Sequence, residues 1–186
     1  FAGNAAEKSG INRIQLFNEE DENLKNQNII QEWAGQIDKV LSENRLFLRC
    51  QKIAPVEPEN NKHLHYEILM GIRDQTGNII PPDHFIPAAE RFKRMPEIDQ
   101  WIISHVFSWI EENRIYYDQI DGFSINLSGQ SINSEEFLEY LKQLLMNSSV
   151  PYEKLTFEIT ETVAADSLVY VKKFIQQIKQ FGCKFS

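Results

Sequence analysis

The stretch FSINLSGQSINSEEFLEYLKQLLMNSSVPYEKLTFEI at positions 123–159 contains the pattern that decides the fold. It predicts a strand over 123–127, an amphipathic helix over 135–146 and a second strand over 155–159. A further helix and a third strand, which begins at Cys183, are predicted to follow. Strands and helices that alternate at these lengths are typical of right-handed parallel βα units. The stretch therefore predicts an α/β fold with a parallel sheet.

The residues before this stretch predict a hairpin. The strands 46–53 and 65–72 are separated by a polar turn over 55–62, so we expect the two strands to pair antiparallel. A second turn is predicted at Asp121-Gly122, directly before the regular pattern. Apolar residues at three- and four-residue steps predict three helices around the hairpin. These helices cover 29–44, 85–92 and 96–110.

Composition and charge exclude several classes of function. The 186 residues contain 19 Lys and Arg against 27 Asp and Glu, which gives a formal net charge of −8 at pH 7. An acidic surface repels phosphate chains, so no nucleic acid polymer is expected as a partner. No run approaches the roughly 20 apolar residues of a membrane span, and we expect no membrane contact in this segment.

The two cysteines indicate the cellular compartment. Cys50 and Cys183 each lie in an apolar run, which favours free, buried thiols over a disulfide. A reducing compartment follows from this interpretation. We therefore expect a cytoplasmic protein, or the cytoplasmic part of a larger membrane-attached sensor.

Polar side chains stand where the predicted strands end. Glu67 lies in the apolar strand HYEILMGI, and Asn126 follows the next strand's apolar run. Glu158 ends the run Leu-Thr-Phe, and Glu161 comes three residues later. Functional groups gather at the carboxyl ends of parallel strands. Carboxylate and amide oxygens there are hard ligands of the kind that hold Mg²⁺ or Mn²⁺.

Each of these residues also has an ordinary structural interpretation, and the sequence leaves both open. Glu67 faces solvent if its strand is half-buried. Asn126 is a plain strand end if Ser128 caps the next helix. Glu161 favours a helix dipole if a helix begins beside it. Taken together, however, several unpaired carboxylates in a barrel interior favour a bound cation that neutralises them.

Three longer motifs resemble a known family. They are HYEILMGIRDQTGNIIPPDHFIPAAERFKRMPEIDQWII at 65–103, SINLSGQ at 124–130 and LTFEITET at 155–162. Together they resemble the EAL domain family, the cyclic di-GMP phosphodiesterases of bacterial signalling, with Glu67-Ile68-Leu69 at the signature Glu-Ala-Leu. The resemblance implies a modified (β/α)₈ TIM-like barrel with an antiparallel first strand, which is incomplete in this chain.

The resemblance also divides the chain into parts. Residues 37–186 resemble the N-terminal part of an EAL domain, whereas FAGNAAEKSGINRIQLF at 1–17 resembles the C-terminal end of a GGDEF domain. Residues 18–36 are then expected to form the connecting linker and helix. This arrangement implies a tandem GGDEF-EAL protein, expected as a homodimer through EAL and connecting-helix contacts.

Roles for individual residues are carried over from the family. Metal binding is expected at Glu67, Asn126 and Glu158, catalysis at Glu67 and Glu161, and substrate contact at Gln51, Leu69 and Arg73. In the family, two Mg²⁺ or Mn²⁺ ions activate a water that hydrolyses cyclic di-GMP to pGpG. The resemblance thus implies cyclic di-GMP as the ligand and a divalent metal as the cofactor.

The sequence departs from the family pattern at the expected substrate site. Gly71 stands where the family commonly has an Arg that contacts a substrate phosphate, and Arg73 shares that side of the strand by alternation. Lys52 replaces a Pro, and Ile68 replaces the Ala of the signature. The chain also stops before the Asp-Asp-Phe-Gly motif, so we expect the fragment alone to be inactive.

Three functions remain open for the full-length protein. The first is a cyclic-guanylate-specific phosphodiesterase. The second is a catalytically degenerate EAL domain that acts as a cyclic di-GMP receptor. The third is a dimerisation or regulatory module for an attached GGDEF domain.

Overall fold

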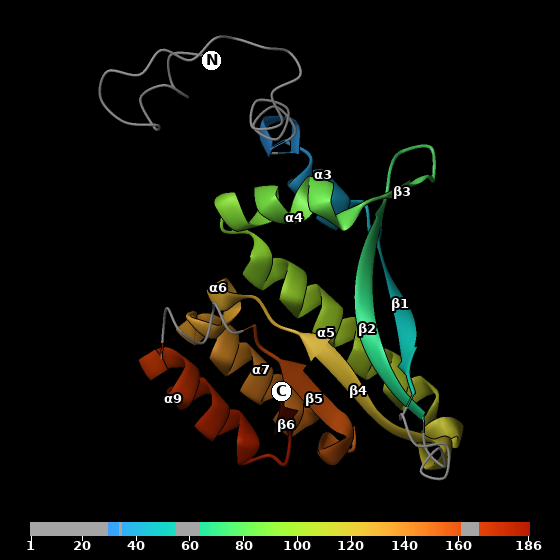
Figure 1. The fold of residues 1–186 in the computed structure, drawn as a ribbon, viewed down its shortest axis with the longest axis vertical. Helices are drawn as coiled ribbons and strands as arrows, with labels where there is room; N and C mark the ends of the chain where they lie inside the picture. Colours follow the sequence, from blue (N-terminus) through green and yellow to red (C-terminus); the bar gives the residue numbers. More distant parts are fainter. Residues whose placement is uncertain (1–29, 34, 55–63, 161–167) are drawn as a thin grey trace.

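The strands form one mixed sheet in the computed structural model, which describes residues 30–33, 35–54, 64–160 and 168–186 (Figure 1). Their order is β1-β2-β4-β5-β6, with the short strand β3 beside β2. The pairs β1–β2 and β2–β3 are antiparallel, whereas β2, β4, β5 and β6 run parallel to one another. The strands are β1 (Leu46–Ile53), β2 (Leu64–Arg73), β3 (Ile79–Ile80), β4 (Ile120–Asn126), β5 (Leu155–Glu158) and β6 (Lys184–Phe185). The predicted hairpin and parallel sheet are confirmed.

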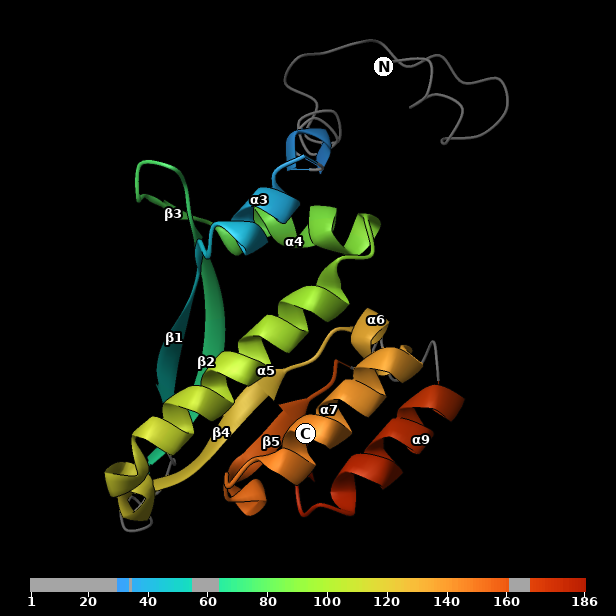
Figure 2. The same cartoon turned by 180° about the vertical axis from the view of Figure 1, so that it is seen from behind.

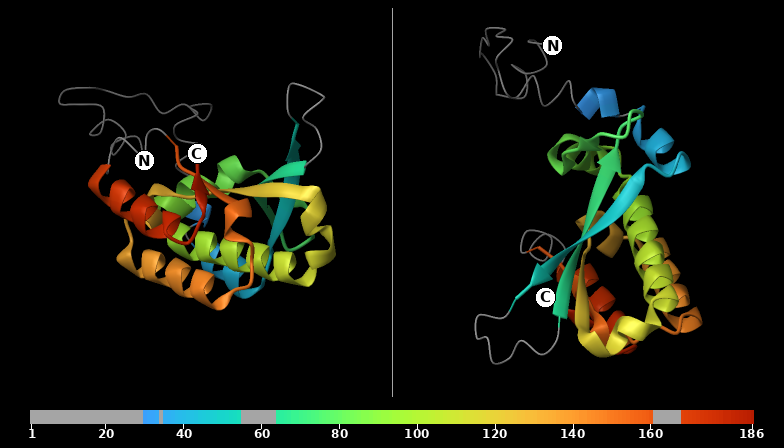
Figure 3. Two further views of the ribbon diagram at one scale, coloured as in Figure 1. Left: turned by 90° about the horizontal axis from the view of Figure 1, so that it is seen from below. Right: turned by 90° about the vertical axis from the view of Figure 1, so that its right-hand side faces the viewer.

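Three long helices cover one face of this sheet (Figure 2). They are α5 (Met95–Glu112), α7 (Glu135–Asn147) and α9 (Leu168–Lys179). The view from below shows the strands above this helical layer (Figure 3). The remaining elements are α3 (Ile37–Ser42), α4 (Pro82–Arg91), α6 (Gly129–Ile132) and the 3₁₀ helices η2 (Arg114–Gln119) and η3 (Tyr152–Lys154). Helices α5, α7 and α9 therefore cover one face of the sheet, and the opposite face is turned away from them.

Aromatic side chains join the helices to the sheet. Phe137 of α7 stacks on Phe174 of α9 with 6.3 Å between ring centroids. Phe185 of β6 contacts both Phe174, at 6.3 Å, and Phe157 of β5, at 5.8 Å. Phe137, Phe157 and Phe174 are at most 1% exposed. Helix α7 begins at a fixed point because its N-cap residue, Ser134, accepts a hydrogen bond from the Phe137 amide.

Three details differ from the sequence predictions. The helix expected over 29–44 is interrupted, because a turn at 35–36 separates helical residues 30–33 from α3. Asp121 and Gly122 lie inside β4 instead of forming a turn. A Cβ atom at Gly122 would lie 3.0 Å from the His65 ring and from the Lys154 carbonyl, so glycine allows close packing between strands.

The prediction that both cysteines are buried is wrong for one of them. Cys50 is exposed, and only Cys183 is buried.

Several predictions fall outside the described residues. They concern the segment 1–17, most of the connector 18–36, the turn 55–62 and Glu161. Among the helices that the structure describes, none is long and apolar enough to cross a membrane.

Candidate functional site

Glu67, Asn126 and Glu158 lie on three adjacent strands. The Nδ2 group of Asn126 donates a hydrogen bond of 2.9 Å to Oε1 of Glu67, across the β2–β4 pair. Glu158 is the register partner of Asn126 in the β4–β5 pair, and its carbonyl accepts a 3.0 Å hydrogen bond from the Leu127 amide. Both glutamates are half-buried, whereas Asn126 is exposed. Asn126 and Glu158 end their strands as predicted, whereas Glu67 lies within β2, which continues to Arg73. The structure therefore brings the three residues side by side, although only two of them stand at a strand end.

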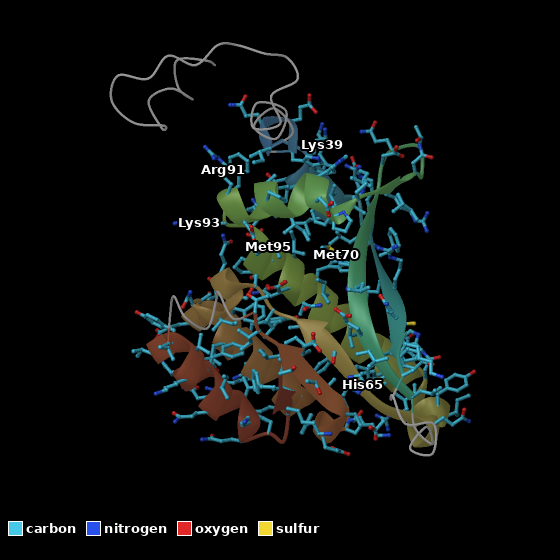
Figure 4. All side chains as sticks on the ribbon, viewed as in Figure 1. Lys39, His65, Met70, Arg91, Lys93 and Met95 are labelled. Atoms are coloured by element: carbon cyan, nitrogen blue, oxygen red, sulfur yellow. The ribbon has the colours of Figure 1, made fainter. Side chains whose placement is uncertain are left out.

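The site lies on the face of the sheet that is turned away from the helices. In β2, Met70 and Ile72 pack against the core, and Figure 4 shows Met70 directed from the strand toward the helices. Side chains alternate along a strand, so Glu67 and Leu69 point to the other face. His65, two residues before Glu67 on β2, lies on the same face, and its Nε2 is 2.8 Å from Oγ of Ser124. Glu67 is thus directed to the face of the sheet that is turned away from α5, α7 and α9.

Gln51 and Leu69 lie beside Glu67 on the same hairpin. Gln51 is the direct register partner of Glu67, and Arg49 is the partner of Leu69. Arg73 lies further along β2, where its guanidinium carbon is 4.6 Å from the ring centroid of Phe47. The predicted substrate residues therefore follow one face of the hairpin from Glu67 outward.

The loop after Asn126 is held by a buried carboxylate that the sequence predictions missed. Asp99 of α5 is 2% exposed, and its Oδ2 accepts hydrogen bonds from the Ser128 amide at 3.0 Å and the Ser131 hydroxyl at 2.6 Å. Burial raises the pKa of Asp99 above its usual value. The sequence contained one signal for this role, since Asp99 is a lone acid within the apolar stripe of its helix.

Ser128 caps the next helix, which is the structural interpretation that the sequence left open beside a functional role for Asn126. It is the N-cap residue of α6, and its side chain accepts a hydrogen bond from the Ser131 amide. This cap does not exclude a functional Asn126, because Asn126 contacts Glu67 on the neighbouring strand. The capping interpretation of the Asn126-Leu127-Ser128 run is therefore confirmed, and the functional role of Asn126 stays a prediction.

The donor set at the site fits a hard divalent cation. Glu67 and Glu158 supply carboxylates, and Asn126 supplies an amide oxygen, which are ligand types that Mg²⁺ and Mn²⁺ accept. Within the described ranges, no group of three His, Cys, Asp or Glu residues is placed to hold a metal ion. Mg²⁺ commonly keeps several waters beside one or two carboxylates.

A large apolar groove lies on the opposite face of the hairpin. Its volume is about 770 Å³, and its lining includes Cys50, Tyr66, Trp101 and Trp109. These side chains come from the outer face of β1 and β2 and from α5. Phe47 and Arg49 of β1 also border the groove, whereas Glu67 does not line it.

The sequence also matches a described protein family. The model of the EAL domain matches residues 35–186. The chain belongs to the EAL domain family. EAL relatives include the cyclic di-GMP phosphodiesterase PdeB of Shewanella oneidensis, which is 34% identical over 98% of this chain, and PdeF of Escherichia coli, which is 28% identical over 82%. The chain spans about a fifth of the length of these curated relatives.

Solved EAL structures share the fold. The FimX EAL domain from Pseudomonas aeruginosa bound to c-di-GMP superposes with a TM-score of 0.73 at 24% identity. The alignment covers 83% of this chain and 60% of that chain. This likeness confirms the modified barrel with an antiparallel first strand, of which the present chain forms part.

Proposed function

We propose that the full-length protein hydrolyses cyclic di-GMP to pGpG. The observation that carries the proposal is the hydrogen bond between Asn126 and Glu67, with Glu158 in register on the next strand. Membership of the EAL family and the 34% identity to PdeB support cyclic di-GMP as the substrate. In this proposal Glu67 and Glu161 are the catalytic acids, and Gln51, Leu69 and Arg73 contact the nucleotide.

Glu67, Asn126 and Glu158 are the proposed ligands of Mg²⁺ or Mn²⁺. When bound, the cation supplies Lewis acidity and neutralises phosphate charge. The two carboxylates provide the negative charge that holds it, while the hydrogen bond from Asn126 fixes the orientation of Glu67. Such local charge compensation suits a nucleotide-binding protein whose net charge is −8.

Incubation of the full-length protein with cyclic di-GMP and Mn²⁺ tests the proposal. We expect pGpG as the product, and we expect Glu67→Gln to lower kcat about 100-fold or more. The matched control is Glu136→Gln, because Glu136 is an exposed acid in the first turn of α7. If the wild-type protein binds cyclic di-GMP at saturation and forms no pGpG, the catalytic proposal is wrong.

A receptor without catalysis is the second candidate. The observation in its favour is Gly71. The family commonly has an Arg at this position that contacts a substrate phosphate, and glycine has no side chain to make that contact. Calorimetry in the presence of a chelator separates the two functions. A receptor binds cyclic di-GMP without metal and without turnover, whereas an enzyme converts it once metal is added.

The domain arrangement is proposed on sequence resemblance. Residues 1–17 would end a GGDEF domain, and residues 18–36 would connect it to the EAL domain in a cytoplasmic homodimer. In a third candidate function the EAL part serves as the dimerisation module of that cyclase. Cyclase activity that survives deletion of everything after Asn44 would contradict this third function.

A further inference from the structure

His65 and Ser124 form a hydrogen bond on the face of the β2–β4 pair that also carries Glu67 and Asn126. Nε2 of His65 lies 2.8 Å from Oγ of Ser124. Two residues further along each strand, Asn126 and Glu67 form the next hydrogen bond, at 2.9 Å. In both bonds the residue on β4 stands 59 positions after the residue on β2. The two bonds are therefore successive steps of one side-chain ladder between the strands.

The His65–Ser124 step is the more enclosed of the two. Ser124 is 2% exposed and His65 is half-buried, whereas Asn126 is exposed. Figure 4 shows His65 near the lower end of β2. A hydrogen bond in a low-dielectric environment is electrostatically stronger than one in water. The step that precedes the candidate metal ligands is therefore the better protected connection between the two strands.

Gly122 provides the space for the His65 ring. His65 is the register partner of Gly122 in the β2–β4 pair. A Cβ atom at Gly122 would lie 3.0 Å from Cε1 and from Nδ1 of the ring. The imidazole thus occupies the space that a side chain at position 122 would need, and its Nε2 extends from there to the Ser124 hydroxyl. Two positions of β4 therefore fit a histidine at position 65.

The register of the two strands changes immediately before this ladder. Leu64 pairs with Ile120, whereas His65 pairs with Gly122, so Asp121 is an extra residue in β4. Without this bulge, the following residues of β4 would shift by one position against β2, and their side chains would turn to the opposite face. His65 is the first residue of β2 in the new register. Its bond to β4 therefore lies at the point where that register is set.

We propose that His65, through its hydrogen bond to Ser124, fixes the stagger of β4 against β2 and so places the Asn126 amide beside Glu67 for metal binding. This inference rests on the proposed function, in which Glu67 and Asn126 are ligands of Mg²⁺ or Mn²⁺. His65 is a positioning residue, since it acts through Ser124. Sequence reasoning did not select it.

Binding of Mn²⁺ to the full-length protein without nucleotide tests this role, measured by electron paramagnetic resonance of the free ion. His65→Leu removes the hydrogen bond but keeps a side chain over Gly122. We expect its Kd for Mn²⁺ to rise about tenfold, because residues that orient metal ligands commonly contribute about 10- to 100-fold to metal affinity. Ser124→Ala should have the same effect, and it removes only one buried atom. His65→Gln, whose side-chain amide can bond Ser124, should stay within about twofold of wild type.

The control and the kinetics separate positioning from damage to the fold. The control is His84→Leu, because His84 is an exposed histidine of α4, and it should bind Mn²⁺ as wild type does. A destabilised protein loses Mn²⁺ sites per chain, whereas a mispositioned site keeps its stoichiometry and loses affinity. In His65→Leu, the Mn²⁺ concentration for half-maximal kcat should rise about tenfold, while KM for cyclic di-GMP at saturating Mn²⁺ changes less than about twofold.

A double-mutant cycle tests whether His65 acts through the Asn126–Glu67 bond. In an Asn126→Ala background that bond is absent, so His65→Leu should change the Mn²⁺ Kd by less than about twofold. An undiminished effect in this background, or a wild-type Kd in both His65→Leu and Ser124→Ala, would overturn the inference. A wild-type protein that binds Mn²⁺ but neither binds nor hydrolyses cyclic di-GMP would overturn the proposed function and leave the positioning role standing. A wild-type protein that binds no Mn²⁺ would overturn both.

Discussion

Ser131 donates a hydrogen bond of 2.6 Å from its hydroxyl to Oδ2 of the buried Asp99 carboxylate. The same oxygen accepts the backbone amide of Ser128, two residues after Asn126. This pair joins helix α5 to the loop that leaves the candidate site. Asp99 therefore anchors the loop that follows Asn126 to helix α5.

Replacement of Asp99 by alanine should destabilise the protein. Asp99→Ala leaves the Ser128 amide and the Ser131 hydroxyl without their buried acceptor, and we expect the free energy of unfolding to fall by about 2 to 4 kcal/mol. Urea denaturation of the full-length protein measures this change. Asp121→Ala is the control, because Asp121 is exposed, and it should change the value by less than about 0.5 kcal/mol. Equal effects of the two substitutions would contradict the anchoring role.

The raised pKa of Asp99 predicts a specific dependence of stability on pH. Because burial raises this pKa above 3.8, the native state holds the proton more tightly than the unfolded state. The resulting contribution to stability is complete below pH 3.8 and is lost as the pH rises through the native pKa, by at most about 1.4 kcal/mol per pH unit. Asp99→Asn removes this contribution.

Parallel measurements on both proteins isolate the effect of Asp99. Unfolding free energies of wild type and Asp99→Asn, determined from pH 3.5 upward, share the contributions of all other groups. The variant should gain stability relative to wild type as the pH rises. A difference that stays constant or changes in the other direction would show that the Asp99 pKa is not raised.

The two thiols should differ in reactivity. Burial raises the pKa of Cys183 to about 12, whereas Cys50 is exposed on β1. The thiolate is the reactive form, so a disulfide reagent such as DTNB should label Cys50 rapidly and Cys183 only after unfolding. The variant Cys50→Ser should lose one equivalent of rapid labelling in the native protein. Rapid labelling that persists in Cys50→Ser, and disappears in Cys183→Ser, would contradict the buried position of Cys183.

The sequence predicted the elements whose patterns are local. Strand β1 spans Leu46–Ile53, as predicted, because an apolar run is followed there by polar residues. Helix α7 begins at the predicted residue, Glu135, since the Ser134 cap and the apolar stripe agree. The positions of Asn126 and Glu158 at the carboxyl ends of β4 and β5 also followed from the order of strands and helices, because parallel strands end on the same side, whereas Glu67 lies within β2 and not at its end.

Features that depend on distant residues were not predicted. The role of Asp99 exists only because α5 packs beside a loop about 30 positions later in the chain. Cys50 lies in an apolar run, yet its burial depends on what covers the outer face of β1, and no described helix covers it fully. The closeness of Phe47 and Gly71 likewise arises from strand register, which sequence periodicity alone does not fix.

The contact between Phe47 and Gly71 predicts that the effect of Gly71→Ala on stability depends on the side chain at position 47. A Cβ atom at Gly71 would lie 2.7 Å from Cε1 of the Phe47 ring. In the wild-type background, Gly71→Ala forces the Phe47 ring away from β2, and we expect a loss of about 1 to 3 kcal/mol in the free energy of unfolding. In a Phe47→Leu background the obstructing ring atoms are absent, and alanine restricts the unfolded chain more than glycine does. The same substitution should then be neutral or stabilise by up to about 1 kcal/mol.

A double-mutant cycle in urea measures this coupling, and a coupling energy above about 1 kcal/mol is expected. The control is Gly35→Ala, since a Cβ atom at Gly35 would have no neighbour within 4 Å, and it should not destabilise the protein in either background. If Gly71→Ala costs the same free energy with and without the Phe47 ring, the ring does not lie over Gly71. The cation–π contact between Arg73 and that ring would then lose its physical basis, because Arg73 is oriented by the position of Phe47.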